Sequence, residues 1–170
     1  VTAETCPHSL VLDDSALEGY NTAAKVCPPL RTSEDVAALR RAVGEGVFDM
    51  FVTDHAPHAA HEKEVPLDEA PNGLIGLETA LSLTYEMVRS NELDEKSFIR
   101  MWHEGPARVF NLPVHCLAPG EPADFFLFDP DLEWTVNRES IHSKSLNTPF
   151  LNRKLRGKVT AHWIGGFRIV

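Results

Sequence analysis

The sequence has few cysteines, no excess of basic residues and no long apolar run, and each shortage excludes a class of protein. Its 170 residues hold only three cysteines, Cys6, Cys27 and Cys116, and no Cys-x-x-Cys pair. Neither a disulfide scaffold nor a cysteine-based zinc site is therefore expected, and a reducing cytoplasm is the default location. No apolar stretch approaches the roughly 20 residues that span a bilayer, so no membrane segment is predicted.

The charge balance is acidic. The chain has 16 Lys and Arg against 25 Asp and Glu, which gives a formal net charge of −9 and a pI of about 5.3. A chain without a basic stripe is not expected to bind nucleic acid or an anionic membrane. The length and the 43% hydrophobic share suit one globular domain, or one with a small second domain.

The chemistry is concentrated in one stretch, Thr53-Asp54-His55-Ala56-Pro57-His58. The mostly apolar segment 47–53 leads into it and predicts a buried strand that delivers Asp54 to the edge of a sheet. Three histidines follow in one loop, the last of them His61. Carboxylate and imidazole are ligands of zinc-type hydrolytic centres. From the residues alone, a turn-capping aspartate followed by solvated histidines is an equally open interpretation.

The first half of the chain predicts a βαβ unit. Segment 1–4 is an expected strand, and Thr32 or Ser33 is expected to cap a helix that ends near Gly44. The strand 47–53 follows that helix, and a strand, a helix and a strand in this order are typical of a parallel sheet.

The second half predicts helices and then strands. A helix is expected over 77–88, with Leu77 on its apolar stripe, and Asp94 is expected to cap another that Gly105-Pro106 stops. Pro106 is expected to start a further short helix over 107–112. The segments 123–128, 158–164 and 167–170 predict strands, with a hairpin turn at Gly165-Gly166.

The stretch around Asp54 resembles the second signature of the dihydroorotases, which are members of the amidohydrolase superfamily. Four further segments resemble that family in the same order: Glu62-Lys63, Gly73 to Thr79, Pro122-Ala123-Asp124 and Asn147-Thr148-Pro149-Phe150. The resemblance covers nearly the whole chain. It implies an α/β fold, with 1–112 as the C-terminal part of a metal-dependent (β/α)8 TIM barrel and 113–170 as part of a small β-sandwich. Because the chain starts with Val1 inside an expected strand, we expect an upstream segment.

The resemblance also implies a function and a site. The function is the reversible hydrolysis of the cyclic amide of dihydroorotate to N-carbamoyl-aspartate in pyrimidine biosynthesis, at a binuclear zinc centre. Asp54 would be both a metal ligand and the catalytic proton carrier, while His58, Asn72 and Gly73 would bind the substrate. Cys27 stands where the family usually has a substrate-contacting Asn. The remaining metal ligands are expected upstream of Val1, so the 170-residue chain alone is not expected to be active.

Three other polar residues have simpler interpretations. His8 follows an expected strand in a Pro-His pair; a place near a site stays open, and packing beside the strand end is the favoured interpretation. Arg31 is expected to stabilise its loop rather than to bind an anion. Lys63 is expected to be a solvated loop cation.

Other functions remain open from the sequence. An allantoinase- or hydantoinase-like hydrolase is favoured by Cys27 and disfavoured by His58 and by Asn147 to Phe150. An inactive dihydroorotase homologue that serves as a scaffold for aspartate transcarbamoylase is a second alternative, and a homo-oligomer is possible in either case. A pure binding module is the least favoured interpretation.

Overall fold

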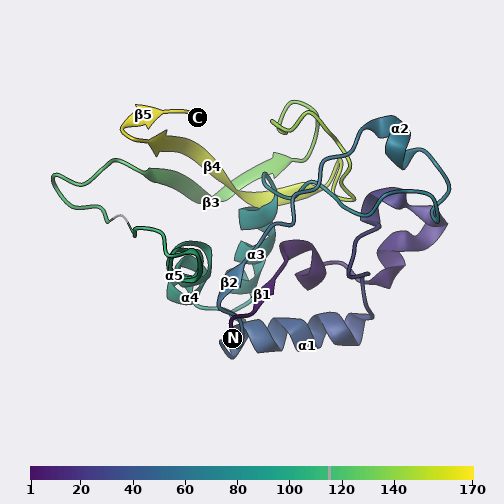
Figure 1. The fold of residues 1–170 in the computed structure, drawn as a ribbon, viewed down its shortest axis with the longest axis horizontal. Coiled ribbons are helices and arrows are strands. Elements are labelled where there is room, and N and C mark those ends of the chain that lie inside the picture. The colour runs from purple at the N-terminus through teal and green to yellow at the C-terminus, as the bar shows by residue number, and fades with distance from the viewer. Residues whose placement is uncertain (115) are drawn as a thin grey trace.

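The structure is a computed structural model that describes residues 1–114 and 116–170. Its helices pack around two small sheets (Figure 1). A parallel sheet pairs β1 (Glu4–Thr5) with β2 (Met50–Phe51), and an antiparallel sheet has the order β3 (Phe125–Thr135), β4 (Lys154–Ile164), β5 (Phe167–Arg168). The α-helices are α1 (Ser33–Gly44), α2 (Ala60–Lys63), α3 (Ala80–Arg89), α4 (Glu95–Ile99) and α5 (Gly105–Phe110). Shorter turns are the 3₁₀ segments η1 (Pro7–Leu10), η2 (Asp14–Tyr20) and η3 (Thr22–Ala24), and the π-helical segment η4 (Arg100–Glu104).

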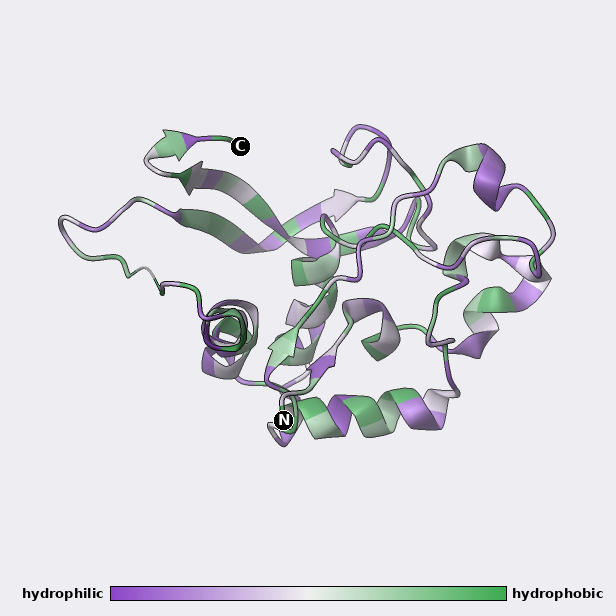
Figure 2. Ribbon diagram, in the orientation of Figure 1, coloured by the Kyte–Doolittle hydropathy of each residue, from purple (hydrophilic) through white to green (hydrophobic). Residues whose placement is uncertain are grey.

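The predicted βαβ unit is confirmed by β1, α1 and β2, although β1 is Glu4–Thr5 and shares only residue 4 with the expected strand 1–4. Thr32 begins α1 with a capping box: its hydroxyl accepts a hydrogen bond from the Asp35 N–H at 3.3 Å, and the Asp35 carboxylate accepts one from the Thr32 N–H at 3.3 Å. Val43 near the other end of α1 is fully buried. β2 is apolar throughout (Figure 2), as expected for a strand in the core.

The strand before Asp54 is shorter than the predicted 47–53. β2 contains only Met50 and Phe51, although backbone hydrogen bonds from Asp49 N to Ala3 O (2.8 Å) and from Val52 N to Thr5 O (3.0 Å) extend its pairing with the β1 segment. The Asp49 carboxylate also accepts a bond from Ala3 N at 2.9 Å and pairs with Arg108 of α5. A polar residue inside the apolar segment therefore ties the small parallel sheet to a helix.

Three apolar clusters form the core of the described residues, and α3 contributes to two of them; the third contains Ala24, Val26, Leu30 and Leu74. The first joins the helices to β2 and contains Leu10, Val43, Phe51, Met87, Leu93, Phe98 and Met101. The second joins α3 to the C-terminal segment and contains Ile75, Leu83, Trp134, Val136, Ile141, Phe150 and Leu155. The antiparallel sheet is therefore packed onto the first half of the chain rather than separated from it.

Two helix boundaries differ from the prediction. α3 begins at Ala80, and Leu77 precedes it with a 60% exposed side chain. The Leu77 N–H donates to the His55 ring, which holds this residue in the turn before the helix. Gly105-Pro106 does not stop the helix that Asp94 caps, because the Gly105 N–H bonds to Arg100 O in a π-helical turn. Pro106 does lie in the first turn of α5, as predicted, and α5 spans 105–110 rather than the expected 107–112.

The three predicted strands of the tail are present with shifted ends. β3 begins at Phe125 rather than at 123 and continues to Thr135, β4 contains the expected 158–164, and β5 ends at Arg168 rather than at 170. Gly165 (φ +56°) and Gly166 (φ +82°) form the predicted turn between β4 and β5. Positive φ at both central positions is the geometry of the tightest hairpins, and glycine adopts it without strain.

The larger architecture is seen only in part. Among residues 1–114 and 116–170 the only sheets are the pair β1–β2 and the three strands β3–β5, so no closed barrel is present. The mixture of helices with a short parallel sheet agrees with a part of an α/β fold, and the barrel and the sandwich stay predictions. No helix in this described part of the chain has both the length and the apolar character needed to cross a membrane.

Two leucines of the α3 region provide a matched test of this packing. Leu83 is 2% exposed in the second cluster, whereas Leu77 is 60% exposed. We expect Leu83→Ala to lower the free energy of unfolding by about 2–5 kcal/mol because it leaves a cavity. Leu77→Ala is expected to change it by less than about 0.5 kcal/mol. Urea denaturation of the two variants measures both, and equal effects would contradict the placement of α3.

Candidate metal and substrate site

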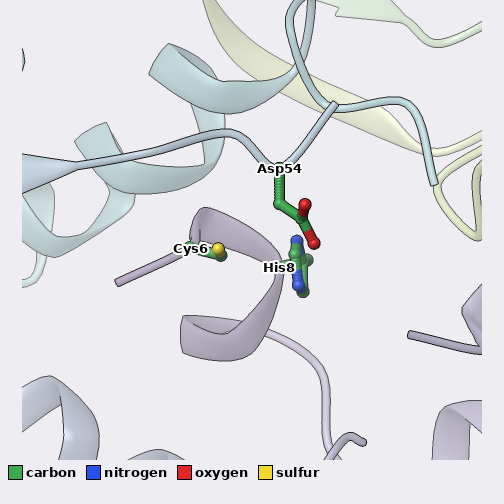
Figure 3. A group of neighbouring side chains, drawn as sticks. All are labelled: Cys6, His8 and Asp54. Atoms are coloured by element: carbon green, nitrogen blue, oxygen red, sulfur yellow. The ribbon is translucent and has the colours of Figure 1, made fainter. Parts of the chain in front are cut away.

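The parallel pairing of β1 with β2 brings His8 and Asp54 to the same edge. Thr5 pairs with Phe51, and His8 and Asp54 each follow their strand's paired residue by three positions. The ligand atoms of Cys6, His8 and Asp54 all lie within 4.8 Å of one another. Figure 3 shows the Asp54 carboxylate facing the His8 ring, with the Cys6 side chain beside them. The arrangement is a cluster of potential metal donors at the carboxyl ends of two parallel strands.

His8 is held in the form that binds metal. Its side chain is buried, and burial lowers the pKa of the imidazole while the nearby Asp54 carboxylate opposes that shift. The neutral imidazole is the metal ligand, so this environment suits coordination. Both interpretations of His8 hold in part, because the ring is buried beside the strand end and also faces Asp54.

Cys6 is a weaker donor than its neighbours. Burial, then the charges of Asp54 and Glu4, raise the pKa of its thiol to about 11. A thiol with this pKa is protonated at neutral pH, whereas metals bind the thiolate. The donor set therefore fits a zinc-type ion mainly through the His8 nitrogen and the Asp54 carboxylate, which is exposed at this edge.

His55 has a structural role rather than a ligand role. Its Nδ1 atom accepts hydrogen bonds from the N–H groups of Gly76 (3.1 Å) and Leu77 (3.3 Å). An acceptor nitrogen carries no proton, so the ring is the neutral tautomer with its proton on Nε2. His55 thereby ties the loop after β2 to the turn before α3. His61 is exposed on α2.

The predicted substrate-binding residues His58, Asn72 and Gly73 lie together. His58 Nε2 is 3.0 Å from Asn72 O, and a Cβ added at Gly73 would lie 3.3 Å from the same nitrogen. The Gly73 N–H donates to Lys25 O at 2.8 Å, which brings the segment that carries the exposed thiol of Cys27 toward this group. The geometry groups the residues, and their contacts with a substrate stay predictions.

Two lysines hold the long loop between α2 and α3. Lys25 Nζ donates to Leu67 O (2.7 Å) and Ala70 O (2.6 Å), and Lys63 Nζ donates to Pro71 O (2.7 Å). Lys63 is 7% exposed, so the expectation of a solvated cation is wrong. Burial and the positive charge of Lys25 lower the pKa of Lys63. Arg31 forms an exposed ion pair with Asp35 at 3.5 Å, which agrees with the expected role in its loop.

Gly73 is the backbone position most constrained by this geometry. It has φ +125°, and an added Cβ would lie 2.5 Å from the Ala56 Cβ. Gly19 also has a positive φ, +70°, with no atom within 4 Å of an added Cβ. We expect Gly73→Ala to lower the free energy of unfolding by more than Gly19→Ala, which carries only backbone strain of about 1–2 kcal/mol. Urea denaturation of both variants measures the difference. A smaller effect at Gly73 would show that Gly73 and Ala56 can move apart to make room for the added methyl group.

Comparison with curated proteins finds relatives that match across this chain. A protein named dihydroorotase from Anaeromyxobacter dehalogenans is 48% identical over 172 aligned residues, covering 100% of this chain and 40% of the relative. A second protein of that name, from Geotalea daltonii, is 46% identical, covering 92% of this chain and 37% of the relative. The chain thus spans about 40% of the length of the curated relatives it matches.

Solved structures match the fold. The dihydropyrimidinase from Brevibacillus agri superimposes with a TM-score of 0.90 at 28% identity, covering 100% of this chain and 39% of that one. The D-hydantoinase from Bacillus sp. AR9 gives a TM-score of 0.87 at 26% identity, with 100% and 39% coverage. The family model described as "Amidohydrolase family" matches residues 5–168. The chain therefore belongs to the amidohydrolase family.

Proposed function

We propose that this chain is part of a metal-dependent cyclic amidohydrolase that acts as a dihydroorotase. The observation that carries the proposal is the meeting of His8 and Asp54 at the carboxyl ends of two paired parallel strands. The identity of 42–48% with proteins named dihydroorotase supports this choice among cyclic amidohydrolases. The reaction would be the reversible opening of dihydroorotate to N-carbamoyl-aspartate, a step of pyrimidine biosynthesis in the cytoplasm.

The chain's own residues would hold the metal and move the proton. His8 and Asp54 would ligate a zinc-type ion, which supplies a Lewis acid and lowers the pKa of a bound water. The exposed Asp54 carboxylate would accept a proton from the attacking water and deliver it to the leaving nitrogen of the ring. The buried His8 would stay neutral and fixed in orientation. His58, Asn72 and Gly73 would orient the ring beside Asp54.

The rest of the centre is proposed to lie on residues outside this chain. Only three donor groups converge in the described part of the chain, and a binuclear zinc site needs more ligands than these. We place 1–112 in a (β/α)8 barrel with the centre at its carboxyl-end face and 113–170 in a β-sandwich. Turnover by the 170-residue chain alone is not expected. Self-association or association with aspartate transcarbamoylase would involve surfaces beyond this site.

A second candidate function is a hydantoinase- or allantoinase-like activity. The exposed Cys27, in place of the usual Asn, favours it, and the solved structures that match the chain are named dihydropyrimidinase and hydantoinase. A panel of dihydroorotate, hydantoin, dihydrouracil and allantoin separates the candidates. Turnover of allantoin or hydantoin without turnover of dihydroorotate would reverse the order.

Substitution of the two ligands tests the centre. In the complete enzyme, we expect Asp54→Asn to lower kcat by about 10²–10⁴-fold, because the amide neither accepts the proton nor carries the ligand charge. We expect His8→Asn to lower the bound zinc measured by atomic emission. The matched controls are Asp68→Asn and His61→Asn, two exposed side chains of the same types. Full zinc content in His8→Asn would show that His8 is not a zinc ligand.

Substitution of Cys27 tests the substrate contact. If Cys27 occupies the place of an amide that binds the ring, Cys27→Asn in the complete enzyme adds a hydrogen bond and should lower the KM for dihydroorotate by about tenfold. The exposed Cys116 provides the control variant Cys116→Asn, for which no change in KM is expected. An unchanged KM in Cys27→Asn would show that the position does not touch the substrate.

A further inference from the structure

Asn147 lies at the junction of the two segments that carry the proposed substrate-binding residues. Its side chain is 7% exposed and comes from the segment between β3 and β4. The amide nitrogen donates to Ala56 O at 2.9 Å and to Gly73 O at 3.1 Å. The amide oxygen accepts from the His58 N–H at 3.1 Å. One buried side chain thus joins the loop after Asp54 to the Asn72–Gly73 segment.

The surroundings fix the orientation of this amide. Ala56 O and Gly73 O can only accept a hydrogen bond, so the group that faces them must be the NH₂. The His58 N–H can only donate, so the group that faces it must be the oxygen. The side-chain amide therefore matches three partners of two kinds at once. An isosteric carboxylate would place an oxygen against two carbonyls.

Further hydrogen bonds hold the backbone and the side chain of Asn147 in place. Asn147 O accepts from Ile75 N at 3.0 Å, and the Ser145 hydroxyl lies 2.6 Å from the Asn147 amide oxygen and within hydrogen-bond distance of His58 O. A hydroxyl has one proton, so Ser145 donates to one of these oxygens at a time. Because Asn147 is buried and its amide is fully bonded, it is placed to hold His58 and Gly73 rather than to touch a substrate.

We propose that Asn147 is a positioning residue for substrate binding, which fixes His58 against Gly73 through its side-chain amide. The inference rests on the proposed function for the identity of the substrate. It assigns to the C-terminal segment a direct part in the site, beyond packing against α3. Loss of the two N–H donors should let the two segments separate and weaken binding of the cyclic substrate.

The test uses Asn147→Asp in the complete enzyme, which keeps the shape and removes the donors. Asn137→Asp is the matched control, because Asn137 lies in the same segment and its side-chain oxygen accepts from Ser140 N (2.9 Å), a contact that aspartate retains. We expect the KM for dihydroorotate to rise by about tenfold in Asn147→Asp, with a smaller change in kcat and unchanged zinc content. Asn137→Asp should leave all three unchanged.

Hydrogen exchange measured by mass spectrometry provides a readout that does not depend on the substrate. Peptides spanning residues 56–73 should exchange faster in Asn147→Asp and at the wild-type rate in Asn137→Asp. If Asn147→Asp does not fold by circular dichroism, Asn147→Ser removes the same donors without adding charge. Unchanged KM and unchanged exchange would overturn the positioning role. The wild-type enzyme could also fail to act on dihydroorotate while Asn147→Asp still exchanges faster than wild type. That result would support the positioning role and overturn the proposed function.

Discussion

The structure depends on the pairing of two very short parallel strands. Parallel strands expose their carboxyl ends at a common edge, and equal spacing after Thr5 and Phe51 brings His8 and Asp54 together there. The helix between the strands makes this pairing possible, because a parallel connection must cross back over the sheet. A change of register would separate the imidazole from the carboxylate. The proposed chemistry therefore rests on two pairs of strand residues and the backbone hydrogen bonds that flank them.

The loops around that edge are ordered by buried and half-buried polar side chains that bind backbone groups. Lys25 and Lys63 donate hydrogen bonds to carbonyls of the long loop, and the His55 ring accepts hydrogen bonds from two backbone N–H groups. The Asn147 amide both donates to backbone carbonyls and accepts from a backbone N–H. A buried polar group without a partner would cost roughly 1–3 kcal/mol, so each of these side chains specifies one arrangement of the loop it binds. Every buried side-chain N and O atom in the described part of the chain has a hydrogen-bond partner.

The same edge gives His8 and Asp54, two potential metal donors, different environments. Burial keeps the His8 imidazole neutral, whereas the Asp54 carboxylate is exposed and remains available to solvent and substrate. A fixed neutral ligand beside an accessible carboxylate suits a centre in which one group holds an ion and the other also moves a proton. The tail contributes as well, since its apolar residues pack on α3 and the Asn147 amide donates to Gly73 O.

The sequence by itself determined the local features of this protein. The capping box at Thr32, the cap at Asp94, the Gly165-Gly166 turn and the delivery of Asp54 by an apolar strand all follow from short-range geometry and residue chemistry. The family resemblance identified His58, Asn72 and Gly73 as a group. Only the tertiary structure decided which distant residues meet. His8 lies 46 positions before Asp54 in the sequence, and its Pro-His pair predicted no partner until the strand register was known. Lys63 and Leu77 differed from expectation for the same reason: a loop carbonyl holds Lys63 and the His55 ring nitrogen holds the Leu77 N–H, and tertiary packing supplies both partners.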